Sequence, residues 1–183
     1  MRPIWTWAGK LYDFAMPLPK YLDDLFRHMA WADAVVWRAV LSHDHDDRTY
    51  KLLLHIHQVQ HAFLSVWRGV ETPPWRDFSA VPDLPSLAQW AREYHERVPE
   101  HLAGVSEEQL DAPMEVTWKR WVEKAIGRAP AVTTLRETMM QVSQHSTYHR
   151  GQVNARLREL GIDAPLTDFI AWVWQKKPAP EWP

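Results

Sequence analysis

The chain has 183 residues, a formal net charge of −2 and no cysteine, so we expect a single domain over residues 1–183. The near-neutral charge, without a run of like charges, predicts neither a nucleic-acid partner nor an anionic membrane partner, and no apolar run approaches the ~20 residues of a membrane span. The absence of cysteine excludes disulfides, thiolate metal sites and a cysteine nucleophile, and it is typical of a cytoplasmic protein.

The first helix is expected to begin at Pro17 or Pro19 and to end near Ser42. Its apolar residues alternate in steps of four and three, which is typical of a helix with one buried face. They are Leu18, Leu22, Leu25, Met29, Ala32 and Val36. Trp31 and Val35 lie outside this stripe, and they mark either a dimer surface or a contact with the preceding N-terminal residues.

Two further helices are expected before residue 105. The second starts at a capping residue, Asp46 or Asp47, and ends near Gly69. The third starts at Ser86, and Pro99 is expected to kink or shorten it because proline lacks a backbone N–H. The buried face of the third helix is predicted to consist of Leu87, Trp90, Ala91, Tyr94, Val98 and Leu102.

The second half of the chain completes the predicted fold. Residues 105–132 give the weakest pattern, and within them we expect a short strand at 115–118, paired in a hairpin. The last long helix opens with a capping box at 134–137 and ends before Gly161, a residue suited to the position after a helix. A short helix is expected within 166–174. The prediction is an all-α four-helix bundle with a short extra C-terminal helix and a small β-hairpin before the last long helix.

Two histidines lie one turn apart on the last long helix. His145 and His149 share a helix face because residues four apart are neighbours on it. With Val142 as its centre, the apolar arc that contains both histidines also holds Leu135, Met139, Val153, Leu157 and Leu160. Buried imidazoles need partners for their ring nitrogens, and one metal ion would satisfy both.

The second helix offers three candidates for a third ligand: His55, His57 and His61. Its apolar face is assigned to Leu52, Ile56, Val59, Phe63 and Val66. His55 lies roughly 80° from the centre of that face, whereas His57 and His61 point ~120° or more away. His55 is therefore the expected third ligand, because its side chain lies nearest to the buried face of the helix. Three neutral nitrogens would leave coordination positions open, as in catalytic metal sites.

The residues around these histidines resemble the DinB-like (DinB/YfiT) metalloenzyme family. The resemblance rests on Leu53-Leu54-His55-Ile56 followed by Leu64, on His145-x-x-x-His149-Arg-Gly-Gln152 with Leu157-Arg-Glu-Leu-Gly161, on Trp31-Ala32-Asp33, and on Thr167-Asp-Phe-Ile170. It implies a four-helix bundle, often a homodimer, in which His55, His145 and His149 hold one divalent ion. Nickel or zinc is the expected ion, with iron or manganese as alternatives. The characterised relatives include thiol S-transferases and a glutathione- or mycothiol-dependent isomerase.

Three functions compete for this sequence. The first is a metal-dependent enzyme of thiol S-transferase or hydrolase type that acts on a small-molecule substrate, such as a low-molecular-weight thiol. The second is a di-iron bundle, but the Glu-x-x-His element on which such sites rely occurs nowhere in the chain. The third is a non-catalytic bundle in which the metal stabilises the fold or the dimer. No motif identifies a general base, because both G-x-S-x-G and H-E-x-x-H are absent.

The remaining polar residues of interest are given structural roles. The other histidines are interpreted as solvated or bonded to neighbours: His43, His45, His57, His61, His95 and His101. Asp33 is interpreted as part of a surface salt bridge, with hydrogen bonding to a ligand histidine as the alternative. Arg150 is expected to pair with a helix carboxylate rather than with an anionic substrate. Gly151 is expected to permit a close approach between helices.

A substrate pocket is expected above the metal. The loop over residues 70–85 and the segment 105–132 are long enough to cover one end of the bundle, and loops on a rigid scaffold often carry substrate contacts. The tryptophans of these segments, Trp75, Trp118 and Trp121, suit an apolar or thioether-bearing ligand.

Overall fold

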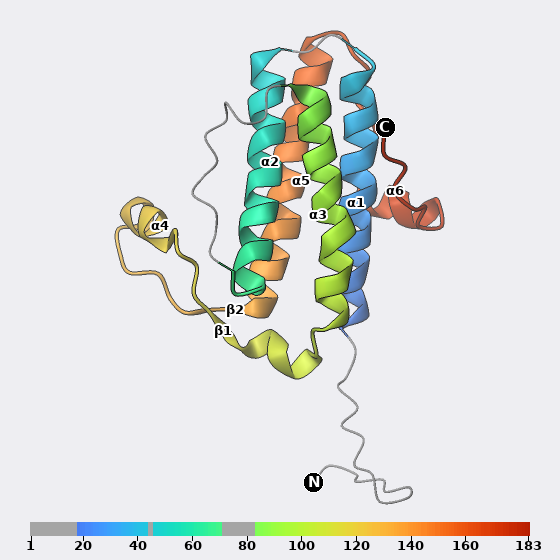
Figure 1. Ribbon diagram of the computed structural model, residues 1–183. Coiled ribbons are helices and arrows are strands. Elements are labelled where there is room, and N and C mark those ends of the chain that lie inside the picture. Colours follow the sequence, from blue (N-terminus) through green and yellow to red (C-terminus); the bar gives the residue numbers. More distant parts are fainter. Residues whose placement is uncertain (1–17, 44–45, 71–82) are drawn as a thin grey trace, which may run out of the picture.

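The computed structural model describes residues 18–43, 46–70 and 83–183, and these residues form the predicted all-α bundle (Figure 1). Its four long helices are α1 (Lys20–Leu41), α2 (Asp47–Trp67), α3 (Leu84–Ala103) and α5 (Leu135–Glu159). The contacting pairs are α2–α5, α1–α5, α2–α3 and α1–α3, so each helix touches two others around one core. None of the described helices is long and apolar enough to cross a membrane.

Shorter elements connect and follow the long helices. They are η2 (Glu107–Asp111), β1 (Pro113–Met114), α4 (Lys119–Ile126), β2 (Thr133–Thr134) and α6 (Phe169–Trp174). Strand β1 pairs antiparallel with β2, which confirms the predicted hairpin, and α6 is the predicted C-terminal helix. The strand expected at 115–118 is wrong. Pairing ends at Met114, and the residues between the strands form α4, which buries none of its side chains.

Local hydrogen bonds explain why α2 and α5 begin where the sequence predicts. The Asp46 carboxylate accepts a hydrogen bond from the Thr49 backbone N–H at 2.9 Å and so caps α2. Thr134 and Glu137 form the reciprocal capping box of α5. Gly161 follows that helix with a φ of 76°, a left-handed conformation that glycine adopts without steric cost. These caps satisfy backbone groups that a helix leaves unpaired at its ends.

Helix α3 differs from its prediction at both ends. Its cap is Asp83 rather than Ser86, because the Asp83 carboxylate accepts from the Ser86 backbone N–H at 2.8 Å. Pro85 then lies in the first turn, where its missing N–H leaves no bond unmade. At the other end, the helix continues through Pro99 to Ala103, so Pro99 does not shorten it.

A polar layer lies between the two larger apolar clusters of the bundle. One cluster includes Leu22, Met29, Phe63, Tyr94 and Met139, and the other includes Trp37, Ile56, Leu87, Val153 and Leu157. Between these levels, buried polar side chains come from all four long helices: Asp33, His57, Gln60, His95, Ser146 and Arg150. Polar groups at such depth are stable only when they are hydrogen-bonded.

The C-terminal segment covers the outer face of α1. Trp31 packs against Trp172 of α6, and Val35 is partly buried in the same cluster. The indole N–H of Trp172 donates a hydrogen bond to the carbonyl of Pro178 at 3.0 Å. Trp31 and Val35 therefore lie beneath the chain's own C-terminal segment, and the predicted dimer surface at these residues is wrong. The alternative contact with residues 1–17 lies outside the described residues.

The role expected for Gly151 is also wrong. Gly151 is exposed on α5, and a β-carbon built there would meet no atom within 4 Å. Glycine in a helix interior costs roughly 0.5–1 kcal/mol relative to alanine, because it loses more backbone freedom on folding. We therefore expect Gly151→Ala to raise the free energy of unfolding by about that amount in urea denaturation. Gly161→Ala should lower it, because the φ of 76° disfavours a side chain. A Gly151→Ala variant less stable than the wild type would contradict the finding that a β-carbon at this position has free space around it.

Candidate metal centre

Three histidines converge where α2 lies beside α5 (Figure 1). His55 extends from α2, and His145 and His149 extend from successive turns of α5. One ligand atom from each lies within 4.8 Å of the others, and all three side chains are partly exposed. The ring centroids are separated by 4.9 Å for His55 and His145, 4.6 Å for His55 and His149, and 4.3 Å for the pair on α5. The structure thus brings together the three residues that the sequence selects.

The electrostatic environment favours the unprotonated form of two of the three histidines, His55 and His145. Burial, followed by repulsion from His149, lowers the pKa of His55 below its ordinary value. Burial lowers the pKa of His145 to about 4, with further contributions from His149 and His55. Among the described residues, the cluster contains three imidazoles and no carboxylate. Neutral imidazoles present lone pairs, which is the state that a metal ion requires.

The nitrogen atoms of the cluster fit a metal ion. His145 Nδ1 is buried and has no hydrogen-bond partner among the described atoms. His149 Nδ1 lies 2.7 Å from the carbonyl oxygen of the Gln152 side chain. An unpartnered buried nitrogen is rare in native proteins, and imidazole nitrogen is a preferred ligand of zinc, nickel, copper and iron. The group could therefore hold an ion through its three rings.

His57 and His61 lie outside the cluster. His57 is buried at 1% exposure, so the prediction that it points away from the apolar face is wrong. Its Nε2 accepts a hydrogen bond from the Trp37 indole N–H at 2.9 Å, and its Nδ1 lies 2.8 Å from Gln60 Oε1. His61 Nε2 donates to the Trp90 carbonyl at 2.9 Å. Both histidines are bonded to neighbours as expected, and His45 lies outside the described residues.

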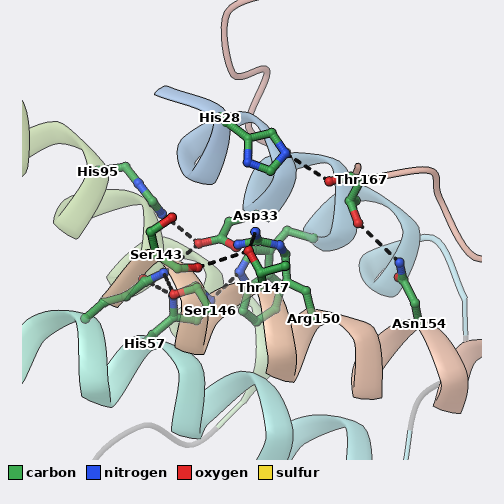
Figure 2. A network of polar contacts seen from close by, with 12 residues as sticks. His28, Asp33, His57, His95, Ser143, Ser146, Thr147, Arg150, Asn154 and Thr167 are labelled. Atoms are coloured by element: carbon green, nitrogen blue, oxygen red, sulfur yellow. Dashed lines mark hydrogen bonds and ion pairs between the residues drawn. The ribbon is translucent and has the colours of Figure 1, made fainter. Parts of the chain in front are cut away.

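Asp33 is the centre of the buried polar layer (Figure 2). Its side chain is 2% exposed, and its Oδ1 accepts a hydrogen bond from the Arg150 guanidinium at 2.8 Å. Its Oδ2 accepts from Gln60 at 2.7 Å and from His95 Nε2 at 2.9 Å. The expected surface salt bridge is therefore wrong, and so is the alternative bond to a ligand histidine. The expected pairing of Arg150 with a helix carboxylate is confirmed.

The charge of Asp33 is fixed by these partners. Burial alone would raise the pKa of the carboxyl, but the Arg150 guanidinium and the His95 hydrogen bond outweigh burial and hold it far below its usual range. The carboxylate is thus ionised at neutral pH. A buried carboxylate with three donors, one of them a guanidinium, is compensated, whereas the same carboxylate alone would be very costly.

Helix α5 contributes to both the histidine cluster and the buried polar layer, through residues on neighbouring faces. Ser146 directly follows His145, and its hydroxyl accepts a hydrogen bond from Gln60 at 3.0 Å. Arg150 directly follows His149 and also donates to the Thr147 hydroxyl at 2.9 Å. Consecutive helical residues are ~100° apart, so the buried layer fixes α5 on the side next to the histidine cluster. No pattern in the sequence predicts this layer as a whole, although Gln60 is a polar residue on the buried face between Ile56 and Phe63.

The expected pocket above the histidines stays a prediction. Trp75 lies outside the described residues, and Trp121 on α4 is 63% exposed. Trp118 packs edge-on against Phe63, with the ring centroids 5.0 Å apart. A cavity of about 520 Å³ lies elsewhere, between α1, α3 and the C-terminal segment, and its wall includes His95 and Pro178.

Fold and cluster together define a class: four-helix bundles with a three-histidine centre between two of the helices. The family model for the DinB family matches residues 16–181. The chain therefore belongs to the DinB family, which confirms the resemblance seen in the sequence. No curated protein matches the chain.

Proposed function

We propose that this chain binds one divalent metal ion through His55, His145 and His149 and is a metal-dependent enzyme of thiol S-transferase or hydrolase type. The observation that carries the proposal is the cluster itself, in which three ligand atoms lie within 4.8 Å of one another on partly exposed side chains. Zinc or nickel is the proposed ion, because both accept imidazole ligands readily; iron and manganese are the alternatives.

The protein's contribution is to hold and orient three neutral donors. Helices α2 and α5 position the rings, and the lowered pKa of His145 and of His55 keeps those rings free of protons near neutral pH. Because three protein ligands leave coordination positions open, a bound ion would supply a Lewis acid for a substrate oxygen or hold a thiol as its thiolate. The partial exposure of the rings would admit a small substrate, for which we propose a low-molecular-weight thiol.

A structural ion is the second candidate. The cluster joins α2 to α5, so an ion there would also tie two helices together and stabilise the bundle or a homodimer. Screening the metal-loaded protein with low-molecular-weight thiols and electrophiles, and with ester substrates, separates the two candidates. Turnover that disappears in His145→Ala supports the enzyme, whereas a raised melting temperature without turnover supports the structural ion.

The metal ligands are tested by changing each of five histidines to alanine and measuring metal per chain by elemental analysis. We expect one ion in the wild type, loss of the ion on changing His55, His145 or His149, and retention on changing His57 or His61. Circular dichroism checks that each variant folds, which matters most for His57 because it is buried. Full occupancy in His55→Ala or His145→Ala would refute the assignment, and two ions per chain would favour a di-metal centre.

A further inference from the structure

The hydrogen bond between His149 and Gln152 determines which nitrogen of His149 carries the proton. Nδ1 of His149 lies 2.7 Å from Oε1 of Gln152, three residues further along α5. An amide oxygen can only accept, so Nδ1 must be the donor. In a neutral imidazole one nitrogen is protonated and the other has a lone pair. The lone pair of His149 is therefore on Nε2.

The same arrangement occurs a second time, at His57, where a hydrogen bond also shows which role the other ring nitrogen has. His57 Nδ1 lies 2.8 Å from Oε1 of Gln60, which is also three residues further along its helix. Nε2 of His57 accepts a hydrogen bond from the Trp37 indole N–H at 2.9 Å. An indole N–H can only donate. A glutamine three residues after a histidine thus leaves Nε2 as the acceptor in this fold, and no indole within residues 18–43, 46–70 and 83–183 donates to Nε2 of His149.

We propose that Gln152 is a positioning residue that fixes His149 in the tautomer with Nδ1–H, so that Nε2 is available to the metal ion. This inference rests on the proposed function, since it assigns a role toward the same centre. His145 has no such support from the described residues, because none of them forms a hydrogen bond with its buried Nδ1. Gln152 therefore sets the orientation of the His149 ring before the ion binds.

The expected effect on affinity follows from the exposure of the ring. His149 is partly exposed, so without Gln152 its Nδ1 would bond to water and both tautomers and several ring orientations would be populated. Only molecules with the lone pair on Nε2 would be ready to bind. Partners that orient a metal-bound histidine typically contribute about 10–100-fold in metal affinity.

The test compares three variants of the full chain. Gln152→Leu keeps the approximate size of the side chain but removes the acceptor, whereas Gln152→Glu keeps an acceptor oxygen. Gln144→Leu is the matched control, because Gln144 is an exposed glutamine on the same helix. Dissociation constants for Zn²⁺ and Ni²⁺ are measured by competition with a chelator. We expect Gln152→Leu to bind about 10–100-fold more weakly, Gln152→Glu to bind at least as tightly as the wild type, and Gln144→Leu to be unchanged.

A second measurement does not depend on metal binding. Long-range ¹H–¹⁵N spectra of the metal-free protein report the tautomer of each histidine. We expect His149 to carry its proton on Nδ1 in the wild type and to become a mixture in Gln152→Leu. A wild-type proton on Nε2, or equal affinity of Gln152→Leu and wild type, would overturn the role of Gln152. A wild type that has the expected tautomer but binds neither ion would refute the metal site while leaving the hydrogen-bond assignment intact.

Discussion

Replacing Asp33 with asparagine is expected to lower the free energy of unfolding by about 3–5 kcal/mol, because removing one partner of a buried ion pair leaves the other charge uncompensated. Arg150 is as deeply buried as Asp33, at 2% exposure. The carboxylate accepts on both oxygens, from Arg150 on one and from Gln60 and His95 on the other. An amide would turn its NH₂ group toward one of these donors. Urea denaturation of the metal-free protein measures the loss.

A matched exposed pair provides the control for this experiment. Asp23 and Arg27 also form an ion pair on α1, with the charged atoms 3.8 Å apart and both side chains about half exposed. Exposed pairs contribute little, so Asp23→Asn should change the stability by less than about 1 kcal/mol. If Asp33→Asn changed it as little, the buried layer would not hold the four helices together. Changing Asp33 and Arg150 together to apolar residues should cost less than the two single changes combined, because no unpaired charge then remains.

Local signals are the reason that the helices could be predicted. Caps such as Asp46 and Thr134 act within one turn, so the sequence near each helix start contains the information needed. The hairpin lacks such local signals, because β1 and β2 are two residues each and pair across 18 intervening residues. Helix α4 buries no side chain, so it has no apolar stripe facing the core that would identify it as part of the bundle.

The candidate site was predictable only in part, for a related reason. The spacing of His145 and His149 depends on one helix alone and therefore transfers directly to the structure. The environment of His57 depends on how α2 faces its neighbours, and α2 buries Leu53 and Leu64 on the side of His57, while Leu52 and Val66 are only partly buried. The Asp33 layer is harder still to predict, because its partners come from three other helices. No periodicity within α1 reports them.

His57 makes the stability of the protein sensitive to acid. Burial lowers the pKa of His57 to about 4, and this outweighs the attraction of Asp33 and the Gln60 hydrogen bond, which act in the opposite direction. His95 and Arg150 add smaller repulsive contributions. The imidazole must be neutral because its Nε2 accepts the Trp37 N–H. A proton on Nε2 would place two donors against each other.

The pH range of the effect follows from the two states of the chain. Above about pH 6.5, the ordinary histidine value, His57 is neutral in both the folded and the unfolded protein, so it contributes no pH dependence. Between that value and the folded pKa of about 4, only the unfolded chain binds the proton. Stability must therefore fall as the pH is lowered through this range, and it levels off below it. At 1.36 kcal/mol per pKa unit, His57 contributes a loss of about 3 kcal/mol.

The contribution of His57 is the difference between the wild type and a His57 variant in the stability that each loses on acidification. Unfolding free energies of the metal-free protein are measured in urea at about pH 7 and about pH 4.5, for the wild type and for His57→Gln, whose amide oxygen can still accept from Trp37. We expect the variant to lose about 2–3 kcal/mol less than the wild type on acidification. His43→Gln changes an exposed histidine at the end of α1, and it should lose as much as the wild type. Equal losses in His57→Gln and wild type would show that His57 is already protonated in the folded core, which its bond with the Trp37 indole forbids.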